Sequence, residues 1–265
     1  MPNRYTIDEL NDLSNVELIA ILRQFHTDRN GGEEPKPRKK RSMPYREYFG
    51  EMYLDPEDKE KRIQMAKDLE RVFLFLFAAM ATLGDITYSS LYQNVESKYW
   101  AAVEPYTEPD GNGYKPRRLS DKSREALKNS IKDFIARQTR DIVDATADNF
   151  SDDYYTSEDR AQLVAENQVN GVENNADMFE AVDYGYTHKT WVTMRDNRVR
   201  DTHADVDGIT LPVEEPFQVG DYEMLFPCDD SLGAGAEEIV NCRCTVEYSN
   251  EGEGQYDENG SRGKP

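Results

Sequence analysis

The chain has 265 residues and a formal net charge of -20 at pH 7. This much negative charge opposes non-specific DNA binding, which depends on Lys and Arg side chains that neutralise phosphates. The hydrophobic fraction of 37% and the mean hydropathy of -0.85 are low for a compact globule. We therefore expect extended helices and surfaces that partners cover.

Two further features concern the compartment in which the protein works. The longest mainly apolar run, Val72 to Leu83, is shorter than the ~20 residues that a membrane span needs, and the N-terminus lacks the layout of a signal peptide. The chain contains three cysteines, an odd number that fits a secreted disulfide framework poorly. We expect no membrane contact and a reducing cytosol.

The N-terminal segment predicts a short docking helix followed by a linker. Apolar residues recur at near-helical spacing from Asp8 to Phe25. From His26 to Ser42 the composition turns to Gly, Pro and charge, and it ends in the basic run Lys36 to Arg41. This run is either a solvated tether or a contact for nucleic acid or an acidic surface, and we expect any DNA contact to be weak or transient.

Four longer helices are predicted in the middle of the chain. The first begins at Pro56, which suits a first turn, and becomes apolar all round from Phe73 to Phe77, which requires burial on every side. The three later helices are predicted from the spacing of their apolar residues. Ser120 caps one of them, and Thr156 with Asp159 forms a capping box at the start of the last. The predicted helices span residues 56–83, 88–102, 120–150 and 156–182. The last is rich in amides, which either bond to a neighbouring element or face solvent.

The last third of the chain predicts a small β-rich module. Strands are expected at Trp191-Val192, Ile209–Val213 and Cys242–Tyr248, because β-branched and aromatic residues suit a half-buried pleated surface. The predicted fold class is α+β, with a mainly helical N-terminal two-thirds followed by this module. The predicted domains are an N-terminal helix and basic linker (1–43), a helical region (44–155), the module with its preceding helix (156–248) and a disordered acidic tail (249–265).

Four residues of the module form a candidate metal site. Asp196-Asn197 favours a turn, so that His203 hangs on a loop or first turn that returns toward the terminal cysteines. His203, Cys228, Cys242 and Cys244 offer one imidazole and three thiolates, a set that a structural zinc ion accepts. The alternative is that these cysteines simply pack as small buried hydrophobes.

Charged and amide side chains around these residues predict a structural polar network. Arg198 and Arg200 alternate along the chain, so both either clamp carboxylates such as Asp196, Asp201 or Asp207, or form a solvated strand end. Arg243 is a candidate for an ion pair with Asp205 or Asp207. The predicted network comprises Arg160, Asp196, Arg198, Arg200, Asp207, Asn241 and Arg243.

Several of these residues belong to motifs that follow one another in a fixed order. The motifs are Arg160-Ala161, the stretch Glu166 to Asn170, Gly185-Tyr186, Lys189-x-Trp191, Asp196-x-Arg198-x-Arg200-x-x-His203, Asp207-Gly208 and Asn241-Cys242-Arg243-Cys244. In this order the chain resembles the tailed-phage head morphogenesis family typified by the phage Mu protein F-like minor head proteins. The resemblance covers roughly residues 156 to 248. Gln168 departs from the family pattern, which often has an acidic residue there, and Cys228 lies where the family more often shows no cysteine.

The resemblance implies a minor capsid protein, present in few copies and bound to the portal vertex inside the virion head after assembly in the host cytoplasm. It implies help with head assembly and with DNA packaging or ejection, the portal protein as a partner, and the major capsid or scaffolding protein as further partners. It does not imply catalysis. The alternative is a metal-dependent enzyme or toxin-like effector that acts on nucleic acid through His203 with Asp201 or Asp207, and this function needs a basic cleft, against which the surrounding charge argues.

Overall fold

The computed structural model describes residues 5–33, 43–52, 54–83, 88–107 and 119–250. These residues form two compact units. The helical unit comprises the described residues within 1–116 and 129–169, and the C-terminal module comprises those within 117–128 and 170–265. The predicted basic run and most of the predicted acidic tail lie outside the described residues. The predicted division into four domains stays a prediction.

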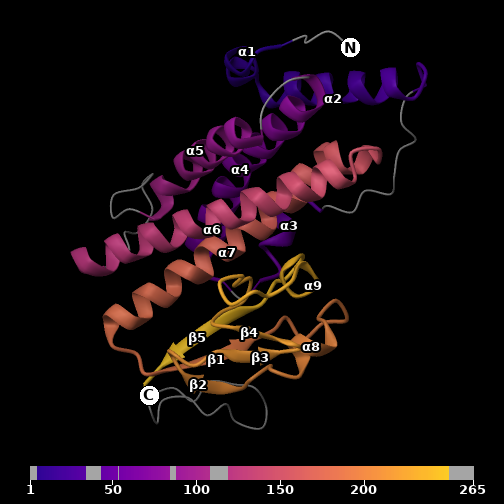
Figure 1. Cartoon of the computed structure of the whole chain (residues 1–265). Coiled ribbons are helices and arrows are strands. Elements are labelled where there is room, and N and C mark those ends of the chain that lie inside the picture. The colour runs from indigo at the N-terminus through magenta and orange to yellow at the C-terminus, as the bar shows by residue number, and fades with distance from the viewer. Residues whose placement is uncertain (1–4, 34–42, 53, 84–87, 108–118, 251–265) are drawn as a thin grey trace. The chain divides into compact units, whose positions relative to one another are not determined.

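The helical unit is built from helices throughout its described part. It holds α1 (Ile7–Asp12), α2 (Asn15–Arg29), α3 (Tyr45–Tyr48), α4 (Pro56–Thr82), α5 (Tyr88–Thr107) and the short 3-10 helix η2 (Asp153–Thr156) (Figure 1). The long helices α6 (Asp121–Asp148) and α7 (Glu158–Tyr184) each contribute residues to both units.

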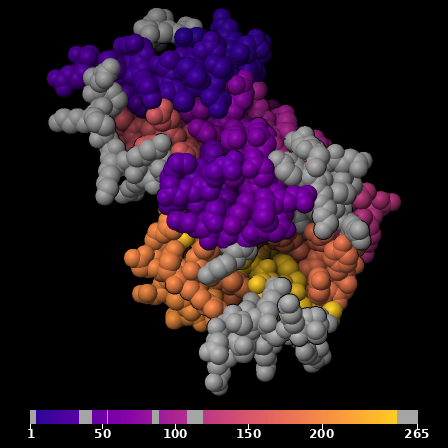
Figure 2. Space-filling view, turned by 180° about the vertical axis from the view of Figure 1, so that it is seen from behind, coloured from indigo at the N-terminus to yellow at the C-terminus, as the bar shows by residue number. Residues whose placement is uncertain are grey.

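The predicted N-terminal helix is in fact two helices. The chain is extended at Leu13, and Ser14 starts α2 with a capping box, in which the Glu17 carboxylate accepts the Ser14 backbone N–H at 2.7 Å. A capping box gives hydrogen-bond partners to two backbone N–H groups that a helix start otherwise leaves unpaired, so starting a second helix here costs little free energy. The indigo side chains of α1 and α2 form one continuous surface in Figure 2.

Helix α4 is the centre of the helical unit, as its sequence predicts. Asp55 caps its first turn, and Pro56 takes the first helical position. Every residue from Phe73 to Phe77 is at most 3% exposed. Helices α2 and α5 pack against α4, and the ring of Phe73 meets that of Tyr99 edge-on at 5.7 Å between centroids.

Two helix boundaries differ from the prediction. α5 continues through Pro105 to Thr107, because a proline in the last turn removes only one hydrogen bond. α7 is capped by Ser157, whose hydroxyl accepts the backbone N–H of Arg160 at 3.2 Å. Thr156 therefore does not cap the helix. It is buried and shares a 2.8 Å hydrogen bond with His26.

The C-terminal module contains two small antiparallel sheets and two short helices. β1 (His188–Val192) is the central strand of the first sheet, between β2 (Thr210–Pro212) and β5 (Thr245–Ser249) (Figure 1). A second sheet, which the sequence did not predict, is the hairpin of β3 (Phe217–Val219) and β4 (Tyr222–Met224). The short helices are α8 (Asp201–Ala204) and α9 (Ala236–Ile239).

The core of the C-terminal module contains all three cysteines. Its buried members are Trp191, Val206, Phe217, Val219, Met224, Cys228, Ala234, Ile239, Cys242 and Cys244. Trp191 is fully buried, and its ring packs edge-on against His203 at 5.6 Å and against Phe217 at 5.2 Å. The residues with metal-ligand chemistry thus lie inside the hydrophobic core.

These elements confirm the α+β class, with helices over the N-terminal two-thirds and short antiparallel strands near the C-terminus. Within the described ranges, no helix combines the length and the apolar character that crossing a bilayer requires.

Candidate functional site

Two successive turns place His203 in the core of the C-terminal module. After β1 the chain turns at Asp196, whose side chain accepts the backbone N–H of Arg198 at 3.0 Å, as in an Asx turn. Helix α8 begins at Asp201 and carries His203, of which 1% is exposed. The turn signal in the sequence thus ends in a buried imidazole.

The two terminal cysteines enter the core from a second turn. Helix α9 ends at Ile239, and Asn241 has a left-handed φ of 61°, which Asn tolerates better than most residues. Cys242 to Cys244 follow, and β5 begins only at Thr245. The prediction of a strand starting at Cys242 is therefore wrong, because the Cys242 backbone N–H bonds to Ile239 O at 3.2 Å within the turn.

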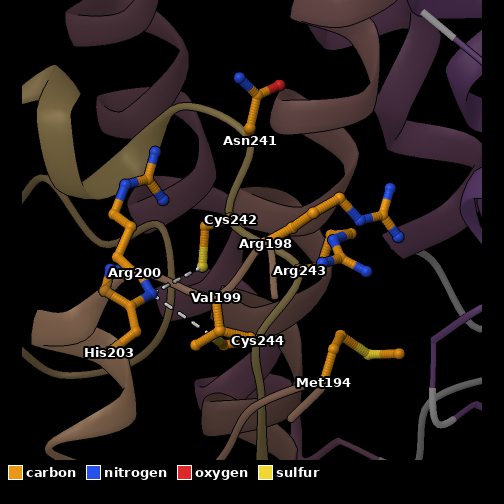
Figure 3. Close-up of a pocket in the computed structure, with 9 residues that line it drawn as sticks. All are labelled: Met194, Arg198, Val199, Arg200, His203, Asn241, Cys242, Arg243 and Cys244. Atoms are coloured by element: carbon orange, nitrogen blue, oxygen red, sulfur yellow. Dashed lines mark hydrogen bonds between the residues drawn. The ribbon is translucent and has the colours of Figure 1, made fainter. Parts of the chain in front are cut away.

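His203, Cys242 and Cys244 converge on one point (Figure 3). Nδ1 of His203 lies 3.4 Å from Sγ of Cys244 and 3.7 Å from Sγ of Cys242. One ligand atom from each of the three residues lies within 4.8 Å of the others, and all three residues are buried. Three of the four predicted metal ligands thus meet.

Cys228, the fourth predicted ligand, lies beside the cluster but outside this 4.8 Å group. It is 1% exposed, has a left-handed φ of 67°, and its thiol lies 3.8 Å from Ile239 O. Its pKa is raised well above the ordinary value, first by a hydrogen bond with Cys242 and then by burial. Cys228 is therefore a neutral thiol in contact with Cys242.

The pKa values of Cys242, His203 and Cys244 are shifted in different directions. Hydrogen bonds from Cys228 and Cys244 hold the pKa of Cys242 well below its usual range, although burial opposes this. Burial alone would lower the pKa of His203, but the hydrogen bond and the charge of Cys242 outweigh burial and raise it. The pKa of Cys244 is raised by its hydrogen bond with Cys242 and by burial. The negative charge therefore concentrates on the sulfur of Cys242.

Glu238 completes the surroundings of the imidazole, and sequence reasoning missed it. Its Oε2 lies 3.0 Å from Nε2 of His203 and accepts the hydroxyl of Thr202 at 2.8 Å. Although Glu238 is a carboxylate, it is only 6% exposed. The sequence signal was weak, because Glu238 is one of two adjacent acids in the short helix α9.

A small pocket of about 10 Å³ lies beside the cluster. It is lined by Met194, Arg198, Val199, Arg200, His203, Asn241, Cys242, Arg243 and Cys244 (Figure 3).

Asp196 pairs with two arginines of the predicted polar network. Arg243 reaches it at 2.7 Å and Arg198 at 3.4 Å. The hydrogen bond from Arg243 is the main cause that holds the pKa of Asp196 below its usual range. The interpretation that Arg243 pairs with Asp205 or Asp207 is wrong, because the turn before α8 places Asp196 against Arg243 instead.

Two further members of the predicted network, Asp207 and Arg200, have different partners. Asp207 accepts the backbone N–H of Thr193 and the Nε of Arg195, each at 2.8 Å. Arg200 donates to the backbone carbonyl of Val240 rather than to a carboxylate. Of the two alternatives for these arginines, Arg198 pairs with the carboxylate of Asp196 and Arg200 bonds to a carbonyl, so neither alternative describes both.

The order of these motifs agrees with a comparison against known families. The model of the family described as Phage Mu protein F like protein matches residues 122–247, just under half of the chain. This segment belongs to the phage Mu protein F-like family. No curated protein matches the chain. No solved structure matches it either.

The Mu protein F-like segment begins well before residue 156 and includes almost all of α6. In the C-terminal module, its helix α7 holds the cysteine segment through two amides. Asn170 donates to the carbonyl of Cys242 at 2.9 Å, and Asn174 donates to the carbonyls of Pro227 at 3.1 Å and Cys244 at 3.5 Å. The sequence left two alternatives for the amides of this helix, contact with a neighbouring element or exposure to solvent. Asn170 and Asn174 follow the first.

In the helical unit, the Mu protein F-like segment contains a second buried polar group. Gln168, the departure from the family pattern, accepts the hydroxyl of Tyr99 at 2.6 Å and donates to Gln138 at 2.8 Å. A neutral amide therefore serves both partners at a position where an acid is common.

Arg160 belongs to the helical unit and not to the network around Asp196. It donates to Thr146 at 2.6 Å and to the carbonyl of Tyr155 at 2.8 Å, and it lies 5.0 Å from the ring centroid of Phe77. Burial lowers its pKa to about 10. The predicted single network is therefore at least two separate groups.

Proposed function

We propose that this protein is a minor head protein of a tailed bacteriophage, which binds the portal vertex inside the head and assists head assembly and DNA packaging or ejection. The family match over residues 122–247 carries this proposal. The family is one of phage head morphogenesis proteins, whose role is structural, so partners of this chain are other head proteins and its site is the virion.

The structure supports a role in attachment rather than in turnover. Helices α6 and α7, which the family segment covers, are 28 and 27 residues long and give extended rigid elements on which contacts can be built. The net charge of -20 keeps the protein from binding DNA without specificity, which suits a protein that must stay at one vertex beside packaged DNA.

The alternative of a nucleic-acid-acting enzyme gains no support from the geometry of His203 and Asp207. His203 is 1% exposed, and its two nitrogens face Glu238 on one side and the cysteine sulfurs on the other. Asp207 is held by Thr193 and Arg195. A base that must reach a polymer needs access, which these contacts deny.

Co-expression with the portal protein of the same phage tests the partner. We expect the two full-length proteins to co-purify and to elute together in size-exclusion chromatography with light scattering at micromolar concentration. The major capsid protein, co-expressed in place of the portal, is the matched control, and its complex should be weaker. Separate elution of folded protein and assembled portal at micromolar concentration would contradict portal binding.

A second experiment tests the position inside the head. Purified DNA-filled heads are treated with protease before and after they are opened, and peptides of this chain are quantified by mass spectrometry. We expect a few copies per head, intact in closed heads and digested in opened ones. Complete digestion in closed heads would place the protein outside and overturn the proposal of an internal location.

A further inference from the structure

The geometry points to a zinc site in the core of the C-terminal module, in which His203 Nδ1, Cys242 and Cys244 bind the ion and Cys228 supplies the fourth ligand. This inference does not depend on the proposed role in the phage head. It rests on four observations on the described residues: the distances among the donor atoms, the orientation of the imidazole, the support of the cysteine backbone and the character of the surroundings.

The first observation is the spacing of the donor atoms. With Zn–N near 2.1 Å and Zn–S near 2.3 Å, a tetrahedral ion sets neighbouring N and S ligands ~3.6 Å apart. Nδ1 of His203 lies 3.4 Å from the sulfur of Cys244 and 3.7 Å from that of Cys242. Two N–S edges of a zinc tetrahedron are therefore already present among His203, Cys242 and Cys244, and Cys228 would move toward them to complete it.

The second observation is the carboxylate behind the imidazole. Glu238 Oε2 lies 3.0 Å from Nε2 of His203 while Nδ1 faces the cysteine sulfurs, so an ion bound at Nδ1 would leave the Nε2–H beside a carboxylate. Metal-binding histidines commonly donate their other N–H to a carboxylate in this way. Thr202 holds the same carboxylate, and a Cβ on Gly220 would lie 2.9 Å from its Oε1, so a side chain there would displace it. A buried carboxylate is costly unless it is paired or hydrogen-bonded, and here Thr202 and the imidazole are its neighbours.

The third observation is the support of the cysteine backbone. Asn170 and Asn174 donate to the carbonyls of Cys242 and Cys244, and Asn174 also donates to the carbonyl of Pro227, next to Cys228. Three of the four ligands are thus positioned by two buried amides of one helix. Ligand segments held before binding lose less entropy when the ion enters.

The fourth observation concerns the surroundings of the donors. Thiolates and imidazole are soft or borderline ligands that select zinc over magnesium or calcium. Three thiolates and one imidazole around Zn²⁺ carry one net negative charge, and Arg200 contributes positive charge at both His203 and Cys228. The indole N–H of buried Trp191 has no oxygen or nitrogen acceptor among the described residues, and its contact with Cys244 favours the ionised sulfur. The small pocket beside the cluster is lined by His203, Cys242 and Cys244, three of the four donors.

Cys228 is assigned as the fourth ligand because it contacts Cys242 from the interior of the core. Its side chain is 1% exposed and belongs to the same core cluster as Cys242, and its sulfur lies 3.8 Å from Ile239 O, the carbonyl that also accepts the backbone N–H of Cys242. A structural zinc site takes four protein ligands and leaves no position for water. The left-handed φ of 67° at Cys228 directs this short segment and costs free energy at a residue other than glycine, which a bound ion would offset.

Metal content and cobalt substitution of the full-length protein test the inference. After purification under reducing conditions, elemental analysis is expected to give about one zinc per chain. Exchange for cobalt(II) should give the visible bands of a tetrahedral ion and near-ultraviolet bands from its thiolates. We expect His203→Asn and Cys244→Ser to lose these spectra, while His188→Asn, a histidine in β1 of the same module, should leave them unchanged.

Two further variants separate ligands from supporting residues. Cys228→Ser should keep cobalt binding but lower the thiolate band by about one third, because one of three thiolates is lost. Glu238→Gln keeps all four ligands and should weaken zinc affinity by about 10- to 100-fold. Circular dichroism of each apo variant shows whether it is folded, so that a lost spectrum is not mistaken for unfolding.

Clear outcomes overturn the inference. Folded wild-type protein that contains no zinc, takes up no cobalt and keeps its melting temperature in chelator has no such site. Zinc content unchanged in the folded His203→Asn and Cys244→Ser variants places the ion elsewhere. A mass lower by two hydrogens under non-reducing conditions identifies a disulfide in place of a metal centre. An unchanged thiolate band in Cys228→Ser removes Cys228 from the ligand set.

Discussion

The two units of the molecule are stabilised in different ways. In the helical unit, α4 buries a continuous run of large apolar side chains from Phe73 to Phe77 against other helices. In the C-terminal module, the core is small, and an imidazole and three cysteines occupy places that aliphatic side chains fill elsewhere. The helical unit therefore depends on apolar area, whereas the module depends on each polar group finding its partner.

The two units should therefore differ in how much stability they lose when a buried residue is substituted. Apolar burial is roughly additive over area, so the helical unit loses stability in proportion to what is removed. A buried polar group is costly as soon as its partner is lost. In the module, Lys189 donates to the carbonyl of Leu225 at 2.8 Å, and the backbone N–H of Thr193 donates to the carboxylate of Asp207 at 2.8 Å. Such groups fix one arrangement of the loops, which is what a cluster of ligands requires.

The largest effect is expected from a cavity in the helical unit. Phe73→Ala removes a ring that is fully buried and packed on Tyr99. We expect the free energy of unfolding to fall by about 3–5 kcal/mol. Chemical denaturation followed by circular dichroism measures this loss, and Val16→Ala on α2, where the residue is 76% exposed, is the control. A loss below about 1 kcal/mol would mean that the helical unit does not rest on this core.

The dependence of stability on pH should sharpen the comparison. Burial raises the pKa of Glu166 in the helical unit from 4.5 to about 7. The unfolded chain ionises first, so stability is full below pH 4.5 and declines as the pH rises to about 7. Glu166→Gln should remove this decline, which amounts to about 3 kcal/mol. Denaturation midpoints across this range measure it, and equal slopes in both proteins would contradict the prediction.

Lys189 in the C-terminal module should show the opposite trend. Burial lowers its pKa from 10.5 to about 8. The unfolded chain keeps its proton to higher pH, so stability falls as the pH drops from 10.5 to about 8 and is constant below. Lys189→Met should abolish this part of the curve. If the variant retains the slope between these values, another group causes it.

The smallest effect is expected from a single amide of the module. Asn170→Ala leaves the carbonyl of Cys242 without the donor that now lies 2.9 Å away. We expect a loss on the order of 1–2 kcal/mol, because a buried acceptor is left unpaired. The control is Asn149→Ala, whose side chain bonds the carbonyl of Ala145 at a partly exposed helix end where water can substitute. Equal losses in the two variants would show that burial of the amide bond does not matter.

Sequence reasoning located the long helices because their signals are local. Residues three or four apart share one face of a helix, so the run from Phe73 to Phe77 and the spacing before Phe150 predict burial without reference to any other segment. The hairpin of β3 and β4 escaped prediction, because three-residue strands are too short for an alternating pattern to stand out. Caps were misplaced by one residue at Thr156, where two hydroxyl residues stand side by side.

By itself the sequence determined the fold class, the positions of the long helices, the turn before His203 and the family of residues 122–247. Only the tertiary structure decided that Glu238 lies behind the imidazole, that Arg243 pairs with Asp196, and that Cys228 stands beside the other ligands. His203 and Cys244 are 41 residues apart in the chain. Local propensities fix only neighbours in sequence, whereas contacts at that separation depend on how several turns and strands pack together.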